Sequence, residues 1–465
     1  MHLELKTNSK VFSPSKNNYS DPANTNINEI DLGYPGTLPT VNEQVIENAI
    51  KACLALNMDI AGVMHFDRKN YYYADLPKGY QITQMETPIG KDGFLEIEID
   101  KKKKKIGIER IHIEEDTAKS LHHKDKTLLN YNRCGVPLIE IVSKPDMKSK
   151  EEAMEYAKTL KEILYYAGVS DCKIEEGSMR CDVNISVSKT EKLGTRSEIK
   201  NIGSISNIGD AIDMEMKRQI KKLESKEPLE EDTRRFDSSK EETIFMRKKE
   251  PNKDYRFLPE PDIPYLYITD DMILKAKETL EILPNERRKL YQERNIPELN
   301  INKLIQNKEL SDYINQFLEE NINFKIASNI LLGDISSYLN NKRTSIFNTN
   351  LTKEKFISLV NYLEEGKISS KIMKEILNKI LETTSSLDEI IKKEGASQIS
   401  DKDEIIKIIK TVLEKNINSA IEYKNGKENA FKFLMGMVMK ESKGKVNPKL
   451  ASEYLKEEIN NIWLL

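Results

Sequence analysis

The pattern of apolar and polar positions changes along the chain at about residue 265–270. Before this point, short segments with apolar residues at every second position alternate with stretches rich in glycine and proline. After it, apolar residues recur at helical spacing in successive segments that contain few prolines. Strands followed by a run of helices indicate an α+β unit joined to helical units.

Two strands and a helix stand out in the first part. Residues 106–113 alternate between apolar and polar, and 138–142 form a short apolar run, so both are predicted strands. Ser149 with Glu152 three residues later is typical of a helix start. Apolar residues follow Ser149 at helical spacing, and Gly168 is expected to end the helix in a left-handed conformation.

A further predicted strand, at 179–187, carries functional groups on one face. A period of two divides its side chains into an apolar and a polar set. The polar set contains Arg180, Asp182, Asn184 and Ser186. A guanidinium, a carboxylate and an amide therefore share one surface of the predicted sheet.

Composition excludes several protein classes. The net charge of −3 provides no global attraction to nucleic acid, so any such affinity must come from a local patch. The four cysteines are isolated in the sequence, which argues against a disulfide framework or a cysteine zinc site. Without a run of about 18 apolar residues or the apolar core of a signal peptide, we expect a cytoplasmic protein that does not enter the membrane.

Several carboxylates occupy positions that an ordinary core does not favour. Glu140 is the only charge in an apolar strand, and an unpaired buried carboxylate is costly. Glu114, Glu115 and Asp116 follow another strand, and Asp182 lies on the polar face described above. If these strands are neighbours, their carboxylates can hold Mg²⁺, which prefers oxygen ligands. Spacing alone favours the alternative, salt bridges to Arg110, Arg133 and Arg180.

No nucleotide-binding or nucleophile motif of a common type is present. The sequence lacks the Walker phosphate loop, so Arg180, Lys200 and Asn201 are the candidate phosphate contacts, although spacing alone favours structural roles for them. A Gly-Ser-rich amidase loop is also absent, so we expect that the chain does not release ammonia from glutamine itself. Residues 424–449 contain seven lysines and two glutamates around an apolar helical stripe, which suits either a phosphate backbone or a solvated face.

Long motifs in this chain resemble those of one family. They are FDRKNY at 66–71, DLPKGYQI at 75–82, HIEEDTAK at 112–119, YNRCGVPLIEIVS at 131–143, EEGSMRCDVNI at 175–185, TRRFD at 233–237 and YRFLPEPD at 255–262. The chain is therefore identified, from about residue 2 to residue 460, as similar to the B subunits of the tRNA-dependent amidotransferase, the GatB/GatE family.

This resemblance implies a fold and an activity. The expected domains are a cradle at 1–285 built on an antiparallel sheet with flanking helices, an all-α helical domain at 286–395, and a small YqeY-like helical tail at 396–465. The implied reaction converts Glu-tRNA(Gln) to Gln-tRNA(Gln), Asp-tRNA(Asn) to Asn-tRNA(Asn), or both. ATP phosphorylates the side-chain carboxylate, and ammonia, which the amidase (A) subunit makes from glutamine, displaces the phosphate. The small (C) subunit joins the other two.

Three alternatives are open at this point. The first is a non-catalytic scaffold that binds tRNA, the second is a member of the longer archaeal sister proteins, and the third is an aminoacyl-tRNA synthetase. A length of 465 residues leaves no room for the inserted domain of the archaeal proteins. HIGH-like and KMSKS-like segments of synthetases are absent.

The resemblance also implies a set of site residues. Metal ligands are expected at His2, Glu115, Glu140 and Asp182, with Glu114 as a neighbour. Catalytic roles are expected for Glu115, Glu140, Asp182, Arg180 and Lys200, where the last two stabilise the transferred phosphoryl group. ATP contacts are expected at Arg133, Asn184 and Asn201, and tRNA contacts at Lys424, Lys427, Lys432, Lys440, Lys443 and Lys445.

The sequence departs from the family in two places. It lacks the short Gly-Leu-Glu-Val-His strand that normally precedes this amino-terminal segment, together with the glutamate of that strand. Some members hold zinc with four cysteines, whose positions here correspond to Ser13, Ser15, Asn28 and Asp31. Without thiolates at these positions, no zinc is expected.

Overall fold

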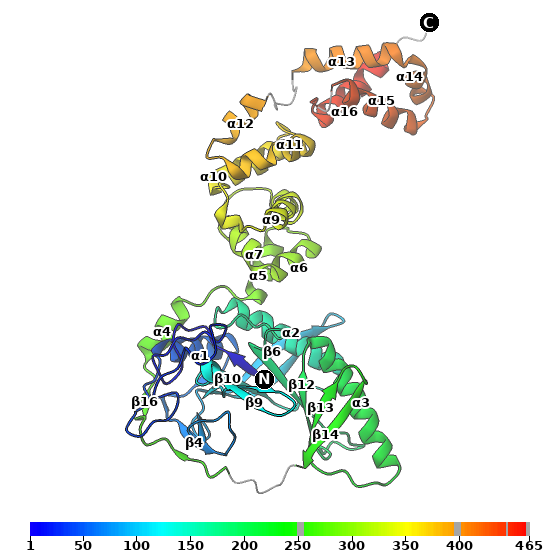
Figure 1. The fold of residues 1–465 in the computed structure, drawn as a ribbon. Coiled ribbons are helices and arrows are strands. Elements are labelled where there is room, and N and C mark those ends of the chain that lie inside the picture. The colour runs from blue at the N-terminus through cyan, green and yellow to red at the C-terminus, as the bar shows by residue number, and fades with distance from the viewer. Residues whose placement is uncertain (249–254, 395–400, 443–444, 462–465) are drawn as a thin grey trace. The chain divides into compact units, whose positions relative to one another are not determined.

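The structure, a computed structural model, describes residues 1–248, 255–394, 401–442 and 445–461 (Figure 1). The chain folds as two units, Met1–Pro284 and Asn285–Leu465. Every strand described lies in the first unit, whereas the described elements of the second unit are all helical. The expected α+β class, with a strand-rich first part and a helical second part, is confirmed. The further division of the helical part at residue 395 stays a prediction.

A nine-stranded sheet forms the centre of the first unit. Its neighbouring strands are antiparallel except for β12 and β13, which run parallel. The short strand β1 pairs with β10 on one side and with β11 on the other. In spatial order the strands are β14 (Glu242–Lys248), β13 (Asp232–Asp237), β12 (Ser197–Ile202), β11 (Met179–Ile185), β1 (His2–Glu4), β10 (Pro137–Ser143), β7 (Lys102–Glu115), β6 (Gly90–Ile99) and β2 (Asp59–Ile60).

Three smaller sheets and several helices complete this unit. The small sheets are β15 (Leu258–Pro259) with β4 (Asp67–Asn70) and β5 (Tyr80–Thr83), β16 (Leu266–Tyr267) with β3 (Val63–Met64), and β8 (Lys119–His122) with β9 (Thr127–Asn130). The helices are α1 (Glu43–Ala55), η1 (Tyr131–Arg133), α2 (Lys150–Tyr166), α3 (Ile205–Glu224) and α4 (Asp270–Glu278). Figure 1 shows α3 running alongside β12, β13 and β14.

The strands predicted at 106–113, 138–142 and 179–187 lie within β7, within β10 and largely within β11. Their alternation places one apolar face toward α2, where the buried side chains include Ile113, Ile139, Met179, Leu160 and Leu164. The opposite face keeps the polar residues, and this face carries the candidate site.

Local signals fix the start and the end of α2. Ser149 Oγ accepts a hydrogen bond from the Glu152 backbone N–H at 3.2 Å, which satisfies a donor that the first turn leaves free. Gly168 follows the helix with φ of +73°. An L side chain rarely adopts this conformation, so glycine is the suitable residue there.

The second unit consists of amphipathic helices around two separate apolar cores, one within residues 291–391 and one within 405–459. No helix among the described residues has the length and apolar character needed to cross a membrane. The elements are α5 (Pro284–Glu293), α6 (Glu298–Gln306), α7 (Lys308–Asn315), α8 (Phe324–Ile330), η2 (Leu331–Ile335), α9 (Ser336–Lys342), η3 (Ile346–Asn348), α10 (Lys353–Glu364), α11 (Ser370–Glu382), α12 (Leu387–Glu394), α13 (Lys402–Lys415), α14 (Ile417–Lys424), α15 (Glu428–Glu441) and α16 (Pro448–Asn461).

Candidate functional site

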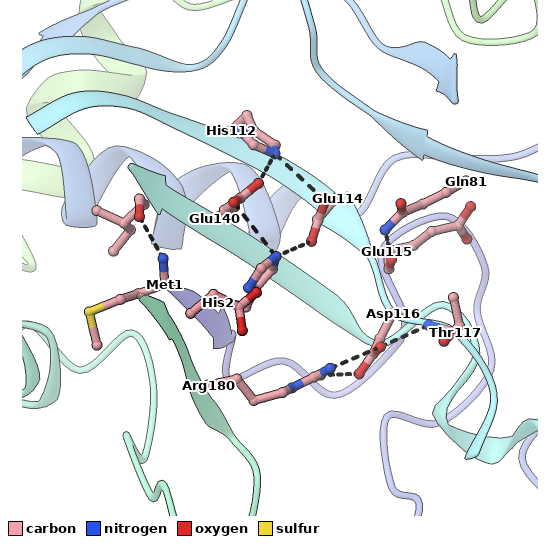
Figure 2. A network of polar contacts seen from close by, with 12 residues as sticks. Met1, His2, Gln81, His112, Glu114, Glu115, Asp116, Thr117, Glu140 and Arg180 are labelled. Atoms are coloured by element: carbon pink, nitrogen blue, oxygen red, sulfur yellow. Dashed lines mark hydrogen bonds and ion pairs between the residues drawn. The ribbon is translucent and has the colours of Figure 1, made fainter. Parts of the chain in front are cut away.

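The pairing of three strands assembles a cluster of histidines and carboxylates. His2 on β1 lies opposite Glu140 on β10, and Glu140 lies opposite His112 on β7. Residues directly opposite each other in a sheet point to the same face. Glu114, two residues after His112, shares that face, and Figure 2 shows the four side chains converging.

In this cluster, imidazoles alternate with carboxylates. His2 Nε2 lies 3.5 Å from Glu114 Oε1 and 3.8 Å from Glu140 Oε1. His112 Nε2 lies 3.0 Å from Glu140 Oε2 and 3.6 Å from Glu114 Oε2. Each carboxylate therefore faces two imidazoles, which offsets the cost of placing two acidic groups side by side.

Burial and charge act in opposite directions on these groups. Burial disfavours a charged imidazole, but hydrogen bonds to Glu114 and Glu140 outweigh this effect and raise the pKa of His112 to about 9. Burial also opposes ionisation of the two glutamates, yet contacts with His112 and His2 hold the pKa of both carboxyls below their usual range. His2 behaves differently, because burial lowers its pKa despite the nearby charges. The result is one cationic imidazole, two carboxylates and one neutral imidazole.

This donor set fits a divalent cation. One ligand atom each from His2, Glu114 and Glu140 lie within 4.8 Å of one another. Two carboxylate oxygens suit a hard ion such as Mg²⁺, and a neutral imidazole supplies a nitrogen lone pair. The side chains of His2 and Glu140 are 25% and 29% exposed, so water and a substrate oxygen have access to complete the coordination.

Glu115 is not part of the cluster, and the prediction that it joins Glu140 is wrong. Successive residues of a strand point to opposite faces, so Glu115 faces away from Glu114. Its carboxylate lies 2.6 Å from Lys78 Nζ and accepts a hydrogen bond from the Ile82 backbone N–H at 2.9 Å. The side chain is 3% exposed, so this pair is buried on the other side of the sheet. Glu114 occupies the position expected for Glu115.

Asp182 and Lys200 lie next to the cluster, not within it. Asp182 Oδ2 accepts a hydrogen bond from Lys200 Nζ at 2.9 Å, and the same ammonium lies 3.3 Å from Glu198. Asp182 is absent from the group of potential metal ligands, although its charge acts on His2. The expected direct grouping of Asp182 with the other ligands is therefore not found.

Arg180 and Arg133, which were both expected to contact phosphate groups, are paired with the same aspartate, Asp116. Arg180 on β11 donates to Asp116, as Figure 2 shows, and lies 3.6 Å from Glu4. Arg133 Nε lies 3.4 Å from Asp116 Oδ2 and donates to the Thr117 carbonyl at 3.0 Å. Asp116 is 5% exposed and receives both guanidinium groups.

The expected ATP contacts Asn184 and Asn201 are both exposed. Asn184 lies on β11 opposite Glu198. Asn201 has φ of +66° and donates from its side-chain amide to the Phe236 carbonyl at 3.3 Å. In this arrangement Asn201 connects the end of β12 to β13.

The sequence interpretation assigned no role to His112, and it gave Asp116 two alternative ones, a carboxylate for Mg²⁺ or a salt-bridge partner of Arg110, Arg133 and Arg180. The alternation of β7 was a sufficient signal for His112, because it places His112 on the face of Glu114. For Asp116 the structure shows the salt-bridge alternative, with Arg180 on β11 and Arg133 in η1 as its partners.

The lysines expected to contact tRNA lie in or beside α14 and α15. Lys432, Lys440 and Lys445 are at least partly exposed. Lys424 donates to the Asn460 carbonyl at 3.3 Å, and Lys427 lies 3.3 Å from Glu422. Lys443 lies outside the described residues.

The positions at which some relatives carry zinc cysteines form a polar cluster here. Ser13 donates to Asp31 Oδ1 at 2.7 Å, and the Asn28 backbone N–H donates to Asp31 Oδ2 at 3.1 Å. The fully buried Lys10 ammonium lies 3.1 Å from the same Asp31 oxygen. Asp31 therefore connects Ser13, Asn28 and Lys10 in a segment that has no thiolates at these positions.

Comparisons with known proteins agree with the motifs. The GatB/GatE catalytic domain family matches residues 1–274, and the GatB domain family matches residues 276–459. The B subunit of the aspartyl/glutamyl-tRNA(Asn/Gln) amidotransferase from Geobacillus thermodenitrificans is 46% identical over 464 residues, which cover 99% of this chain and 98% of that protein. Its counterpart from Bacillus cereus strain B4264 is 45% identical over 463 residues, which cover 99% and 98% of the two chains. The chain therefore belongs to the GatB/GatE family.

Proposed function

We propose that this chain is the B subunit of a glutamine-dependent tRNA amidotransferase, and that it activates the side-chain carboxylate of Glu-tRNA(Gln), Asp-tRNA(Asn) or both. The observation that carries this proposal is the cluster of His2, His112, Glu114 and Glu140 on the polar face of the sheet. Burying two carboxylates at the cost of folding stability is understandable where they bind a cation during catalysis.

His2, Glu114 and Glu140 are the residues that would hold Mg²⁺. A bound Mg²⁺ would supply positive charge that offsets the charge of ATP phosphates and of a developing acyl phosphate. His112 holds the two carboxylates through ion pairs, at 3.0 Å to Glu140 and 3.6 Å to Glu114, so their oxygens need little rearrangement before they act as ligands. Its raised pKa, about 9, keeps this imidazole a cation and a donor at neutral pH.

Arg180 and Lys200 are the proposed cations for the transferred phosphoryl group. Both lie on the same face as the cluster, and both are paired with aspartates, Arg180 with Asp116 and Lys200 with Asp182. Such pairs orient the cations before the substrate arrives, and phosphate oxygens can take over their free donors. Arg133, Asn184 and Asn201 border this surface and stay candidate ATP contacts.

The helical part is proposed to hold the tRNA body. Lys424, Lys427, Lys432, Lys440, Lys443 and Lys445 would contact the phosphate backbone, which positions an RNA without reading its sequence. Ammonia would come from the amidase (A) subunit, with the small (C) subunit completing a cytoplasmic heterotrimer. Zinc is not required, since Asp31 and its partners replace thiolates.

The test is reconstitution with the amidase and the small subunit, ATP, glutamine and each misacylated tRNA. We expect amide formation, together with ATP hydrolysis that misacylated tRNA stimulates. Asp182→Asn should abolish this ATP-dependent activation and leave tRNA binding intact. Asp92→Asn is the matched control, because Asp92 is also paired with a lysine, Lys144 at 2.8 Å, but lies on the surface.

A scaffold without catalytic function gives a different result. Its Asp182→Asn variant would support normal phosphorylation within the complex, and that result would refute the proposed function.

A further inference from the structure

The loop between β4 and β5 exposes two neighbouring aromatic rings. Tyr72 and Tyr73 are 78% and 57% exposed, although aromatic side chains are usually buried. They line an open cavity of about 500 Å³ that the same loop forms. The other lining residues are Ala74, Leu76, Pro77, Lys78 and Gly79.

The loop holds these rings in place. The Leu76 N–H donates to the Tyr73 carbonyl and the Gly79 N–H to the Leu76 carbonyl, each at 3.0 Å. Gly79 has φ of +75°, and a Cβ built on it would lie 3.6 Å from the Tyr72 ring. The Tyr72 ring therefore faces the backbone of Gly79, which has no side chain. Behind it, Tyr71 packs edge-on against Tyr73, with ring centroids 5.9 Å apart.

The loop is anchored beside the proposed catalytic strand. The Ala118 N–H donates to the Asp75 carbonyl at 2.9 Å, just beyond the end of β7. Tyr131 Oη donates to the Ala74 carbonyl at 3.0 Å. Lys78 is bound to Glu115, the residue next to Glu114. The backbone of the loop that carries the two tyrosines is thus anchored beside the strand that carries the candidate metal ligands.

The chemistry of the cavity selects the ligand. Among the described residues that line it, Lys78 alone is charged, and this ammonium is 8% exposed and neutralised by Glu115. A triphosphate needs several cations or hydrogen-bond donors that are not already paired. Because Lys78 is paired with Glu115, this lining suits an uncharged planar group instead. Aromatic faces that are open to solvent bind nucleobases by stacking, which is the usual way in which proteins bind single-stranded RNA ends.

We propose that Tyr72 and Tyr73 form a stacking site for the nucleobase at the 3′ end of the tRNA. This inference rests on the proposed function, because it requires an aminoacylated tRNA end at the sheet.

The experiment uses the complete heterotrimer and tRNA that carries 2-aminopurine as its terminal base. Stacking on the wild-type protein should quench the 2-aminopurine emission, and Tyr72→Ala should remove the quenching. The same variant should raise the KM for misacylated tRNA by about 5- to 150-fold, with the KM for ATP unchanged. Tyr72→Trp should preserve both readouts. Tyr267→Ala, which removes a ring that is 69% exposed elsewhere in this unit, is the matched control.

Three results would overturn the inference. They are unchanged quenching in Tyr72→Ala, a raised KM for ATP instead of tRNA, and weakened association with the amidase at unchanged tRNA affinity. The last of these would identify a protein interface. Quenching needs no turnover, so a failure of the proposed activity in the wild-type complex remains distinguishable from a failure of the stacking site.

Discussion

The two units of this chain differ in how they treat charge. Among the described residues, the first unit buries Lys10, Asp31, His65, Asp67, His112, Glu114, Glu115, Asp116, Glu215, Asp232, Arg234 and Glu260, whereas the second unit buries Arg287 and Lys355. Replacing buried ion pairs by apolar residues of similar size is often neutral or stabilising. The first unit therefore carries charges beyond what a stable core requires, and some of them are available for chemistry.

The second unit achieves its stability by ordinary means. Its larger core packs Phe317 against Phe356, with ring centroids 4.9 Å apart, and Tyr313 against both rings. Its charges are mostly on the surface, where single ion pairs contribute about 0–1 kcal/mol. The difference separates a unit built for catalysis from one built to present a surface.

The largest effect is expected when a buried charge outside the candidate site is removed. Glu215 on α3 is fully buried and accepts bonds from Arg218 at 2.5 Å and Thr243 at 2.7 Å. Glu215→Ala removes a buried carboxylate from Arg218 and Arg234, which keep Asp232 at 3.8 Å and 2.8 Å, and it takes the acceptor from Thr243, so we expect the free energy of unfolding to fall by about 3–5 kcal/mol. Denaturant unfolding measures this change. Glu224→Ala, at the exposed end of the same helix, should change it by less than about 0.5 kcal/mol.

A result of equal size for both α3 variants would mean that the buried network adds nothing, and the distinction between the units would lose its energetic basis.

The next effect concerns activity. Glu140→Gln removes one negative charge from the candidate metal cluster, so misacylated-tRNA-dependent ATP hydrolysis should fall by about 10²–10³-fold. Glu109→Gln, on the exposed side of β7 at 53% exposure, should retain activity. Steady-state kinetics of the reconstituted complex measures both. Full activity in Glu140→Gln would exclude a catalytic role for the cluster.

A smaller effect is expected from the helical unit. The double substitution Lys432→Gln and Lys440→Gln removes two charges of α15 without touching a core. Each lost phosphate contact should reduce the slope of log affinity against log salt by about 0.7–0.9. Filter binding of tRNA across salt concentrations measures the slope. Lys374→Gln, an exposed lysine of α11, is the control and should leave it unchanged.

An altered KM for ATP with an unchanged salt dependence would contradict the role proposed for these lysines.

The smallest effect tests the buried lysine of the second unit. Lys355 Nζ donates to the Ile380 carbonyl at 3.1 Å and the Thr383 carbonyl at 2.6 Å, at the end of α11. Burial lowers the pKa of this ammonium, which means that its charge is poorly solvated. Lys355→Met keeps the length and removes the buried charge, so we expect a loss of about 1 kcal/mol. Thermal unfolding measures this loss of stability. A loss as large as that of Glu215→Ala would mean that both units depend equally on their buried charges.

Sequence periodicity predicted the strands and their polar face well, because alternation is a local property. The same alternation places Glu114 with His112, so the choice of Glu115 as the ligand contradicts a pattern that the sequence contains. The contact between His2 and Glu140 has a different origin. It requires β1 to pair with a strand more than 130 residues away, and no local pattern specifies such pairing. The Lys78–Glu115 pair is also a long-range contact, which joins a loop to the sheet.

The place of β1 in the sheet has a consequence for biosynthesis. His2–Glu4 are synthesised before both of their partner strands, which end at Ser143 and Ile185. At about 5–20 residues per second, translation needs on the order of ten seconds or more before both partners exist. During this interval His2–Glu4 lack the two strands with which they pair. The imidazole that completes the cluster can therefore take its position only after most of the catalytic unit has been synthesised.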